Sequence, residues 1–119
     1  MEDQFRKLSP IEESLIKRLL TAEFPGWKEV SQQLENCRVR VVDTEGSLEI
    51  QTNVKAPAAA VEKAIPVEAQ VTDEDGISVH FLLFVSNGYV SELEIYKDDG
   101  SPIRRLPAPE EFEVIVLPA

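Results

Sequence analysis

Three consecutive segments in the second half of the chain, residues 66–72, 77–85 and 89–97, most constrain its fold. Their sequences, PVEAQVT, ISVHFLLFV and YVSELEIYK, alternate apolar and other residues with the period of two that is typical of half-buried β-strands. DEDG and SNG separate them, and Asp or Asn followed by glycine is what tight hairpin turns favour. These segments therefore predict an antiparallel sheet.

The N-terminal part has the period of a helix instead. In LSPIEESLIKRLLTAEF, Ser9 and Glu12 have the spacing of a capping box, and Pro10 suits the first helical position. Apolar residues then recur every three or four positions until Pro25 and Gly26 end the helix. WKEVSQQLENC, which follows directly, predicts a second and shorter helix.

The remaining segments complete the predicted architecture. CRVRVVD and SLEIQTN flank TEG and predict a hairpin, while KAPAAAVEKA predicts either a loop or a single helical turn. SPIRRL adds either a short strand or a loop, and FEVIVL either a last strand or a packed tail. We expect one α+β domain over residues 1–119, with two N-terminal helices (1–36) on one face of a largely antiparallel, five- to six-stranded meander sheet (37–119).

The hairpin at residues 86–88 closes with either a two-residue or a three-residue loop, and this choice sets the register. A two-residue turn places Leu83 opposite Glu92, which mixes acids into an apolar face. A three-residue loop places Phe81 opposite Leu93 and keeps the apolar residues together. Since a slip of one residue turns every side chain over, the apolar pattern favours the three-residue loop.

On that register the two sheet faces differ in character. The inner face, under the helices, is expected to hold Val79, Phe81, Leu83, Val85, Tyr89, Leu93 and Ile95. The other face is expected to hold Ser78, His80, Glu92, Glu94 and Tyr96 with an apolar centre of Leu82, Phe84 and Val90. We predict this centre as an interface for a second subunit or a protein partner, unless the segment after Pro107 folds back over it.

Charge and cysteine content exclude several classes of function. The formal charge is −10, from 22 acidic against 12 basic residues, so we expect neither nucleic acid nor an anionic membrane as a partner. Cys37, the one cysteine, allows no internal disulfide and is interpreted as a buried structural residue. The acidic start and the short apolar runs, of which Phe81–Val85 is the longest, predict a cytoplasmic protein without a signal peptide or membrane span.

Two candidate catalytic pairs lie on the strands. The predicted register puts His80 opposite Glu94, where the carboxylate could orient the imidazole for acid–base chemistry with Tyr96 nearby. The pattern places no nucleophile or third group, so a surface cross-strand pair explains it as well. Glu92 and Glu94 share one side of a strand, which we interpret as its solvated face. We therefore assign no catalytic residue and expect no cofactor or metal.

The turns carry the clearest binding signal. In a meander the turns at residues 44–46, 73–76 and 98–100 fall at one end of the sheet, with Lys97 as the nearby cation. The resulting cluster is suited to docking a basic protein, although hairpin turns favour Asp and Gly for conformational reasons alone. The predicted partner-binding residues are Asp73, Glu74, Asp75, Asp98 and Asp99.

LSPIEESLIKRLL, VTDEDGISVHFLLFVSNGYVSELEIYKDDGSPI and the proline-rich tail resemble a family of short bacterial proteins classed as a domain of unknown function. Residues 88–103 carry the most distinctive part, and no functional residue transfers from the family. By association with small acidic bacterial proteins, the resemblance implies a toxin-neutralising role. The sequence thus favours an acidic, non-enzymatic binding module, toxin-neutralising or regulatory. The alternatives are a small enzyme using His80 and Glu94, and a homodimeric structural subunit.

Overall fold

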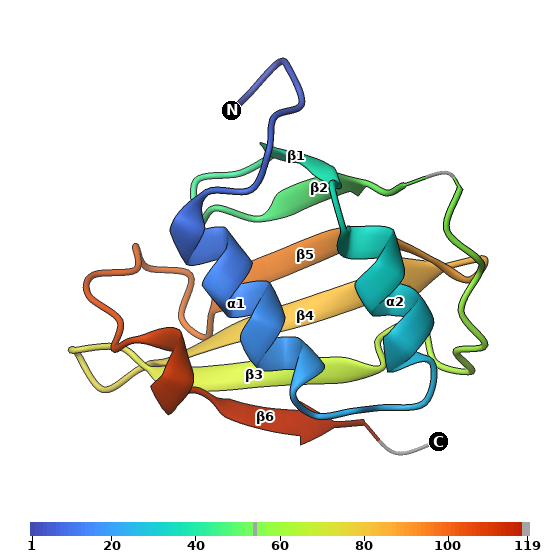
Figure 1. The fold of residues 1–119 in the computed structure, drawn as a ribbon. Helices are drawn as coiled ribbons and strands as arrows, with labels where there is room; N and C mark the ends of the chain where they lie inside the picture. The colour runs from blue at the N-terminus through green and yellow to red at the C-terminus, as the bar shows by residue number, and fades with distance from the viewer. Residues whose placement is uncertain (54, 118–119) are drawn as a thin grey trace.

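Two helices lie side by side across one face of a six-stranded antiparallel sheet, as Figure 1 shows. This computed structural model describes residues 1–53 and 55–117. The helices are α1 (Pro10–Leu20) and α2 (Trp27–Leu34), so the expected α+β class is confirmed. Neither helix in these ranges has the length and apolar character that crossing a membrane requires.

The first helix begins as the sequence predicts. The Ser9 hydroxyl accepts a hydrogen bond from the Glu12 amide at 3.3 Å, and the Glu12 carboxylate accepts one from the Ser9 amide at 2.8 Å. Two otherwise orphaned amides at the helix start are thereby satisfied. Leu15, Ile16 and Leu19 line the buried face of the helix and pack against the sheet.

The strands do not follow one another in sequence order across the sheet. The order is β1-β2-β5-β4-β3-β6, so the sheet is a meander only in part. Residues 55–66 carry the chain past β5 and β4, and 55–64 form neither a helix nor a strand. Residues 101–106 add no strand, whereas 113–116 do. The strands are β1 (Arg38–Val41), β2 (Leu48–Gln51), β3 (Val67–Thr72), β4 (Ser78–Ser86), β5 (Tyr89–Lys97) and β6 (Glu113–Val116).

The C-terminal segment extends the sheet and leaves the face opposite the helices open. The short 3-10 helix η1 (Pro109–Glu111) leads into Phe112, whose ring stacks on Phe81 in the core at 5.0 Å between centroids. The Arg18 guanidinium on α1 donates to the Phe112 carbonyl at 2.7 Å. β6 then pairs with β3 at the edge of the sheet. As far as residue 117, the tail therefore does not cover Leu82 and Phe84.

The β4–β5 hairpin closes with a two-residue turn, so the predicted three-residue loop is wrong. Asn87 and Gly88 have φ angles of +52° and +84°, as a type I′ turn requires, and Ser86 pairs with Tyr89. A β-bulge then leaves Ser91 without a partner. Beyond the bulge Leu83 faces Leu93, because the extra residue restores the parity that the apolar pattern demands.

The bulge explains which face assignments were right. Phe81, Leu83, Leu93 and Ile95 are buried on the inner face as predicted. Between the turn and the bulge the assignment is reversed. Val90, predicted on the open face, is 3% exposed and belongs to the core.

Gln33 joins three parts of the chain in the interior. Its side chain is fully buried, and its amide nitrogen donates to the carbonyls of Pro57 and Gly88 at 3.0 and 2.7 Å. Its carbonyl oxygen accepts from the Val90 amide at 2.9 Å. The residue thus ties α2 to the β4–β5 turn and to the irregular segment that passes it.

Replacing Gln33 with leucine should lower the free energy of unfolding by about 2–4 kcal/mol, because buried partners lose their hydrogen bonds. Urea titration followed by circular dichroism measures this change. Gln32→Leu is the matched control, since Gln32 is exposed on the same helix. Equal effects of the two variants would contradict the anchoring role.

Candidate functional site

Both helices lie on one face of the sheet (Figure 1), and we call the opposite sheet surface the outer face. Leu82 and Phe84 lie half-buried at its centre, and Tyr96 is 39% exposed. Strand alternation brings polar residues around them from four neighbouring strands. These residues are Glu49 on β2, Glu68 and Gln70 on β3, Ser78 and His80 on β4, and Glu92 and Glu94 on β5.

His80 is bound by two carboxylates, neither of which is the predicted Glu94. Its Nδ1 lies 2.6 Å from Glu68 Oε2, and its Nε2 lies 2.7 Å from Asp98 Oδ1. The register places His80 opposite Tyr96 and places Glu94 opposite Leu82. The predicted His80–Glu94 pairing is therefore wrong, because it rested on the three-residue loop.

The environment of His80 limits the chemistry it can perform. Each ring nitrogen lies within hydrogen-bond distance of a carboxylate, so neither nitrogen is left for a substrate. The ring also stacks on Tyr96, with 4.7 Å between centroids. Burial, together with the charges of Glu68 and Asp98, raises the pKa of Tyr96 and keeps its phenol neutral. The contacts of His80 on β4 with Glu68 on β3 and with Asp98 after β5 hold the end of β5 against β3 and β4.

Glu92 and Glu94 on the outer face form no ion pair with any residue that the structure describes, whereas the neighbouring Glu49 does. Glu92 stands directly opposite Glu49 in the sheet, and Arg40 binds Glu49 at 2.7 Å. Burial raises the pKa of Glu92, and the nearby charges of Glu94, Asp43 and Glu49 raise it further. An added cation would therefore be favourable at this position.

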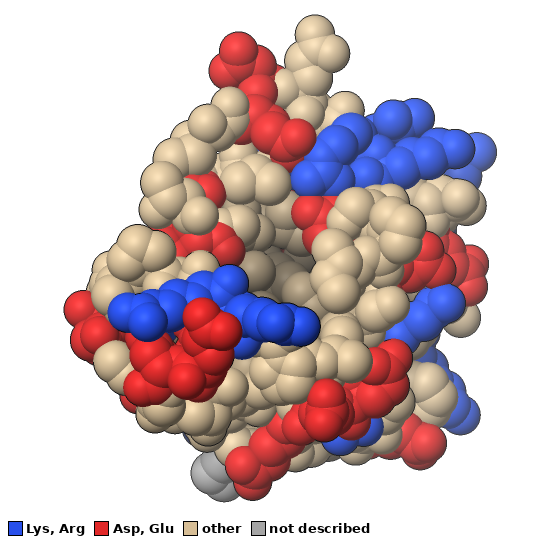
Figure 2. All heavy atoms as spheres, turned by 90° about the vertical axis from the view of Figure 1, so that its left-hand side faces the viewer, with Lys and Arg blue, Asp and Glu red and all other residues tan. Residues whose placement is uncertain are grey.

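All three acidic turns lie at the same end of the sheet, as the sequence predicts, although the strand order differs. Figure 2 looks onto this end and shows acidic and basic side chains intermixed around a central hollow. The hollow has a volume of about 600 Å³ and is lined mainly by apolar residues. They include Leu15 of α1, Phe81 and Ile95 of the sheet, and Ile103 and Leu106 of the following loop.

Two of the predicted partner-binding acids are engaged inside the protein. The Lys97 ammonium, fully buried, donates to Asp73 at 2.9 Å, to Asp75 at 2.6 Å and to the Pro102 carbonyl at 3.1 Å. Asp73, only 3% exposed, also accepts from the Arg104 and Arg105 amides. This Lys97 cluster holds the loop of residues 98–106 against the sheet.

The other predicted acids have separate positions. Asp98 binds His80, and the Asp99 carboxylate accepts from the Ser101 amide and hydroxyl. Glu74 is exposed at the tip of the β3–β4 turn. The turns thus meet at one end without forming a free patch of five carboxylates.

Sequence reasoning named Lys97 as a nearby cation but missed that its buried ammonium binds Asp73 and Asp75. It also missed Glu68 as a partner of His80. Alternation along β5 places Lys97 on the inner face after Leu93 and Ile95, and a lysine at an apolar position next to acidic turns is a usable signal. Glu68 requires the β3–β4 register, in which Gln70 faces His80. Among the residues that the structure describes, no group of three His, Cys, Asp or Glu is arranged to hold a metal ion.

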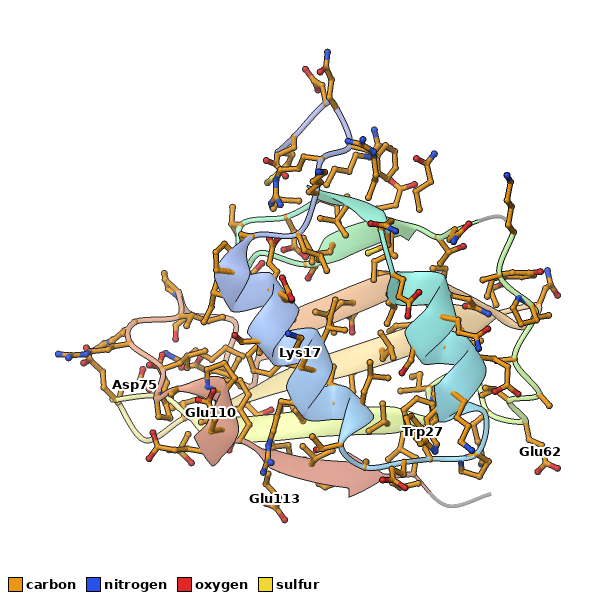
Figure 3. All side chains as sticks on the ribbon, viewed as in Figure 1. Lys17, Trp27, Glu62, Asp75, Glu110 and Glu113 are labelled. Atoms are coloured by element: carbon orange, nitrogen blue, oxygen red, sulfur yellow. The ribbon has the colours of Figure 1, made fainter. Side chains whose placement is uncertain are left out.

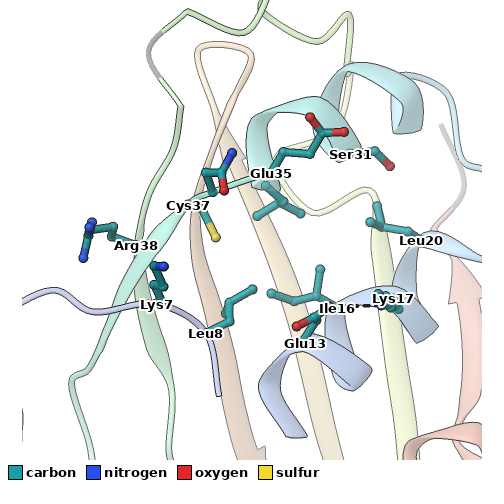
Figure 4. Close-up of a pocket in the computed structure, with 12 residues that line it drawn as sticks. Lys7, Leu8, Glu13, Ile16, Lys17, Leu20, Ser31, Glu35, Cys37 and Arg38 are labelled. Carbon is teal, nitrogen blue, oxygen red and sulfur yellow. Dashed lines mark ion pairs between the residues drawn. The ribbon is translucent and has the colours of Figure 1, made fainter. Parts of the chain in front are cut away.

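A groove between the two helices is bordered by Cys37. Figure 4 shows Cys37 and Leu8 on one side of this groove of about 540 Å³ and Leu20 on the other. Cys37 is 4% exposed, and burial raises the pKa of its thiol. The neutral thiol is a weak nucleophile, so the expected structural role fits its surroundings.

The Lys97 cluster predicts a specific pH dependence of stability. Burial alone raises the pKa of Asp73, but hydrogen bonds from the Arg104 amide, the Lys97 ammonium and the Arg105 amide outweigh it and hold the pKa well below the ordinary 3.8. A lowered pKa in the folded state gives stabilisation that is complete above the unfolded pKa and is lost as the pH falls through the folded one. Asp73 should therefore stabilise the fold at neutral pH and progressively less below about pH 4.

Asp73→Asn should lower the free energy of unfolding at neutral pH more than any exchange of an exposed carboxylate. The deficit should shrink as the pH falls below about 4, because the wild-type protein then loses the same stabilisation. Chemical unfolding at a series of pH values measures both effects, with Glu74→Gln as the exposed neighbouring control. A constant deficit at every pH would contradict this account.

Comparison with known proteins matches one family model to residues 5–107 of this chain, described as Domain of unknown function (DUF6984). No curated protein and no solved structure matches the chain significantly. The family match spans most of the sequence, including both helices and β1 to β5. The chain therefore belongs to the DUF6984 family, a domain of unknown function.

Proposed function

We propose that this protein is a non-enzymatic binding module whose outer face docks a basic protein partner. The observation that carries the proposal is an open sheet face with an apolar centre, Leu82 and Phe84, beside carboxylates that lack a compensating cation. Among these, Glu92 has a raised pKa, caused first by burial and then by its acidic neighbours. A lysine or arginine from a partner would relieve this repulsion.

The outer face supports the proposal better than the acidic turns do. Asp73 and Asp75 already bind Lys97, and Asp98 binds His80. Their charges are therefore partly compensated within the fold. Glu92 and Glu94 lie beside exposed apolar and aromatic surface. A docking site typically combines such an apolar centre with charged residues at its rim.

Toxin neutralisation and regulation are the two roles that we propose for such a module. A toxin-neutralising protein would bind a basic surface of its toxin, and a regulatory protein would bind a basic surface of its target. The net charge of −10 disfavours nucleic acid and anionic membranes as alternative partners. The unpaired Cys37 suits the reducing bacterial cytoplasm that we propose as its location.

An enzyme using His80 has less support. The specific observation in its favour is an imidazole held between Glu68 and Asp98 and stacked on Tyr96. Against it, both ring nitrogens are engaged. Neither the hollow at the turn end nor the interhelical groove includes His80 in its lining.

Charge reversal on the outer face tests the proposal. The probe is a fluorescent peptide of alternating lysine and leucine, whose extended form matches a sheet face, and its binding is measured by anisotropy at several salt concentrations. The double variant Glu92→Lys with Glu94→Lys should bind roughly tenfold or more weakly and with less salt dependence, because like charges then face each other.

The matched control is Glu62→Lys with Glu74→Lys, which changes the net charge equally at two exposed sites away from the outer face. It should retain most of the affinity. If both double variants lose affinity equally, the peptide senses only the net charge and the docking surface is not the outer face. A loss confined to the control would instead favour the turn end that carries Glu74.

A further inference from the structure

The two edges of the sheet differ in how they are covered. The N-terminal segment runs along β1, where the Arg6 amide donates to the Val39 carbonyl at 2.8 Å and the Val39 amide donates back at 2.7 Å. The Glu2 amide adds a third bond, to the Val41 carbonyl at 2.9 Å. β6, at the opposite edge, is the last strand in Figure 1. One edge is therefore covered by the chain itself.

The register shows which backbone groups β6 presents outward. Hydrogen-bonded and non-hydrogen-bonded pairs alternate along antiparallel strands. Because the Leu117 amide donates to the Pro66 carbonyl, Ile115 and Glu113 direct their backbone groups toward β3. Val114 and Val116 consequently direct theirs away from the sheet. Within residues 1–53 and 55–117, no backbone hydrogen bond reaches these two residues from that side.

Beyond Glu113 at its start, the side chains of this strand do not protect its edge. Edge strands are usually blunted by charges, proline or bulges, and residues 114–116 read Val-Ile-Val. Val116 is 43% exposed, and Val114 and Ile115 are half-buried. Val116 also borders a hollow of about 400 Å³ together with Pro25, Val61, Pro66 and Leu117. Apolar side chains and free backbone groups thus occur on the same edge.

We propose that β6 pairs with β6 of a second copy, so that two sheets join into one continuous antiparallel sheet. The register follows when both outward residues of each β6 pair with the outward residues of the other β6, since hydrogen-bonded pairs form between residues whose backbone groups face each other. Val114 then lies opposite Val116 of the second copy, and Val116 opposite Val114. Each of these pairs exchanges two backbone hydrogen bonds. Ile115 meets its own counterpart at the two-fold axis.

This register makes the edge complementary to itself. Apolar residues face apolar residues, and Glu113 faces Leu117 of the second copy and not another glutamate. Figure 3 shows Glu110 and Glu113 toward one end of β6 and Glu62 beyond the other. The acidic beginnings of the two β6 strands would therefore lie apart. Each would lie beside the C-terminal end of the other β6, which both Glu62 and Lys63 border. Val114 of each copy would cover the hollow beside Val116.

Light scattering over a wide range of protein concentrations tests the dimer. The wild-type protein should have twice the mass of the chain, and Val114→Pro should halve it, because proline removes an outward amide that the monomer does not use. The thermal unfolding of the dilute variant should stay close to that of dilute wild type. A wild-type protein that is monomeric at every concentration overturns the proposal. This holds even if the monomer binds an extended lysine–valine peptide at β6, because β6 would then pair with another chain and not with a second copy.

Disulfide trapping tests the register independently of proline tolerance. Ile115→Cys should form a covalent dimer rapidly on mild oxidation, since non-hydrogen-bonded partners have Cβ atoms about 4.5–5.5 Å apart. Glu113→Cys is the control and should cross-link much more slowly, because Leu117 lies opposite it. Buried Cys37 stays in both variants. The proposal is overturned if the dimer survives Val114→Pro and Ile115→Cys cross-links no faster than the control. The dimer would then form through another surface, such as Leu82 and Phe84.

Discussion

The fold depends on the short stretch in which the β4–β5 turn and the bulge at Ser91 together fix the parity of the central hairpin. A two-residue turn alone would direct Glu92 and Glu94 toward the helices and expose Leu93 and Ile95. The unpaired Ser91 reverses this, so the carboxylates line the outer face and the apolar residues reach the core. Gln33 holds the turn in place. Gly88 also permits a close approach of the crossing segment, because a Cβ there would lie 2.9 Å from Ala58 Cβ.

The same stretch shows how far local sequence patterns reach. The capping box, the start of each helix, the strand positions and the inward direction of Phe81 and Leu93 all follow from spacing within a few residues, whereas α1 ends at Leu20, before the predicted stop at Pro25 and Gly26. The bulge does not, because apolar periodicity constrains parity and is satisfied equally by a three-residue loop or by a two-residue turn with one extra residue. Val90 was misplaced for this reason. The pairing of β2 with β5 is also beyond local patterns, because it depends on where residues 55–66 cross.

The candidate binding residues show a different limit, which concerns charge. Asp and Gly in a hairpin turn fit both a docking patch and the conformational needs of the turn, and sequence alone does not separate the two. The deciding residue is Lys97, which continues the inward positions of β5 beneath the loop of residues 98–106. A buried ammonium requires carboxylates, so Asp73 and Asp75 turn inward and bind it. Asp73 and Asp75 are thereby engaged within the fold, whereas Glu92 and Glu94 on the outer face form no ion pair with any residue that the structure describes.

The two proposed binding surfaces, the outer face and the β6 edge, lie apart and could be occupied at the same time. In the proposed function the outer face would recognise a partner through charged side chains, whereas the β6 edge offers backbone groups and apolar contact. Pairing at β6 extends the sheet in its own plane, so it would not cover Leu82, Phe84 or Glu94. A dimer of this kind would carry two acidic outer faces on one continuous sheet, related by a two-fold axis through Ile115. Two such faces would strengthen binding to a partner with repeated basic sites, because the second contact forms at a high effective concentration.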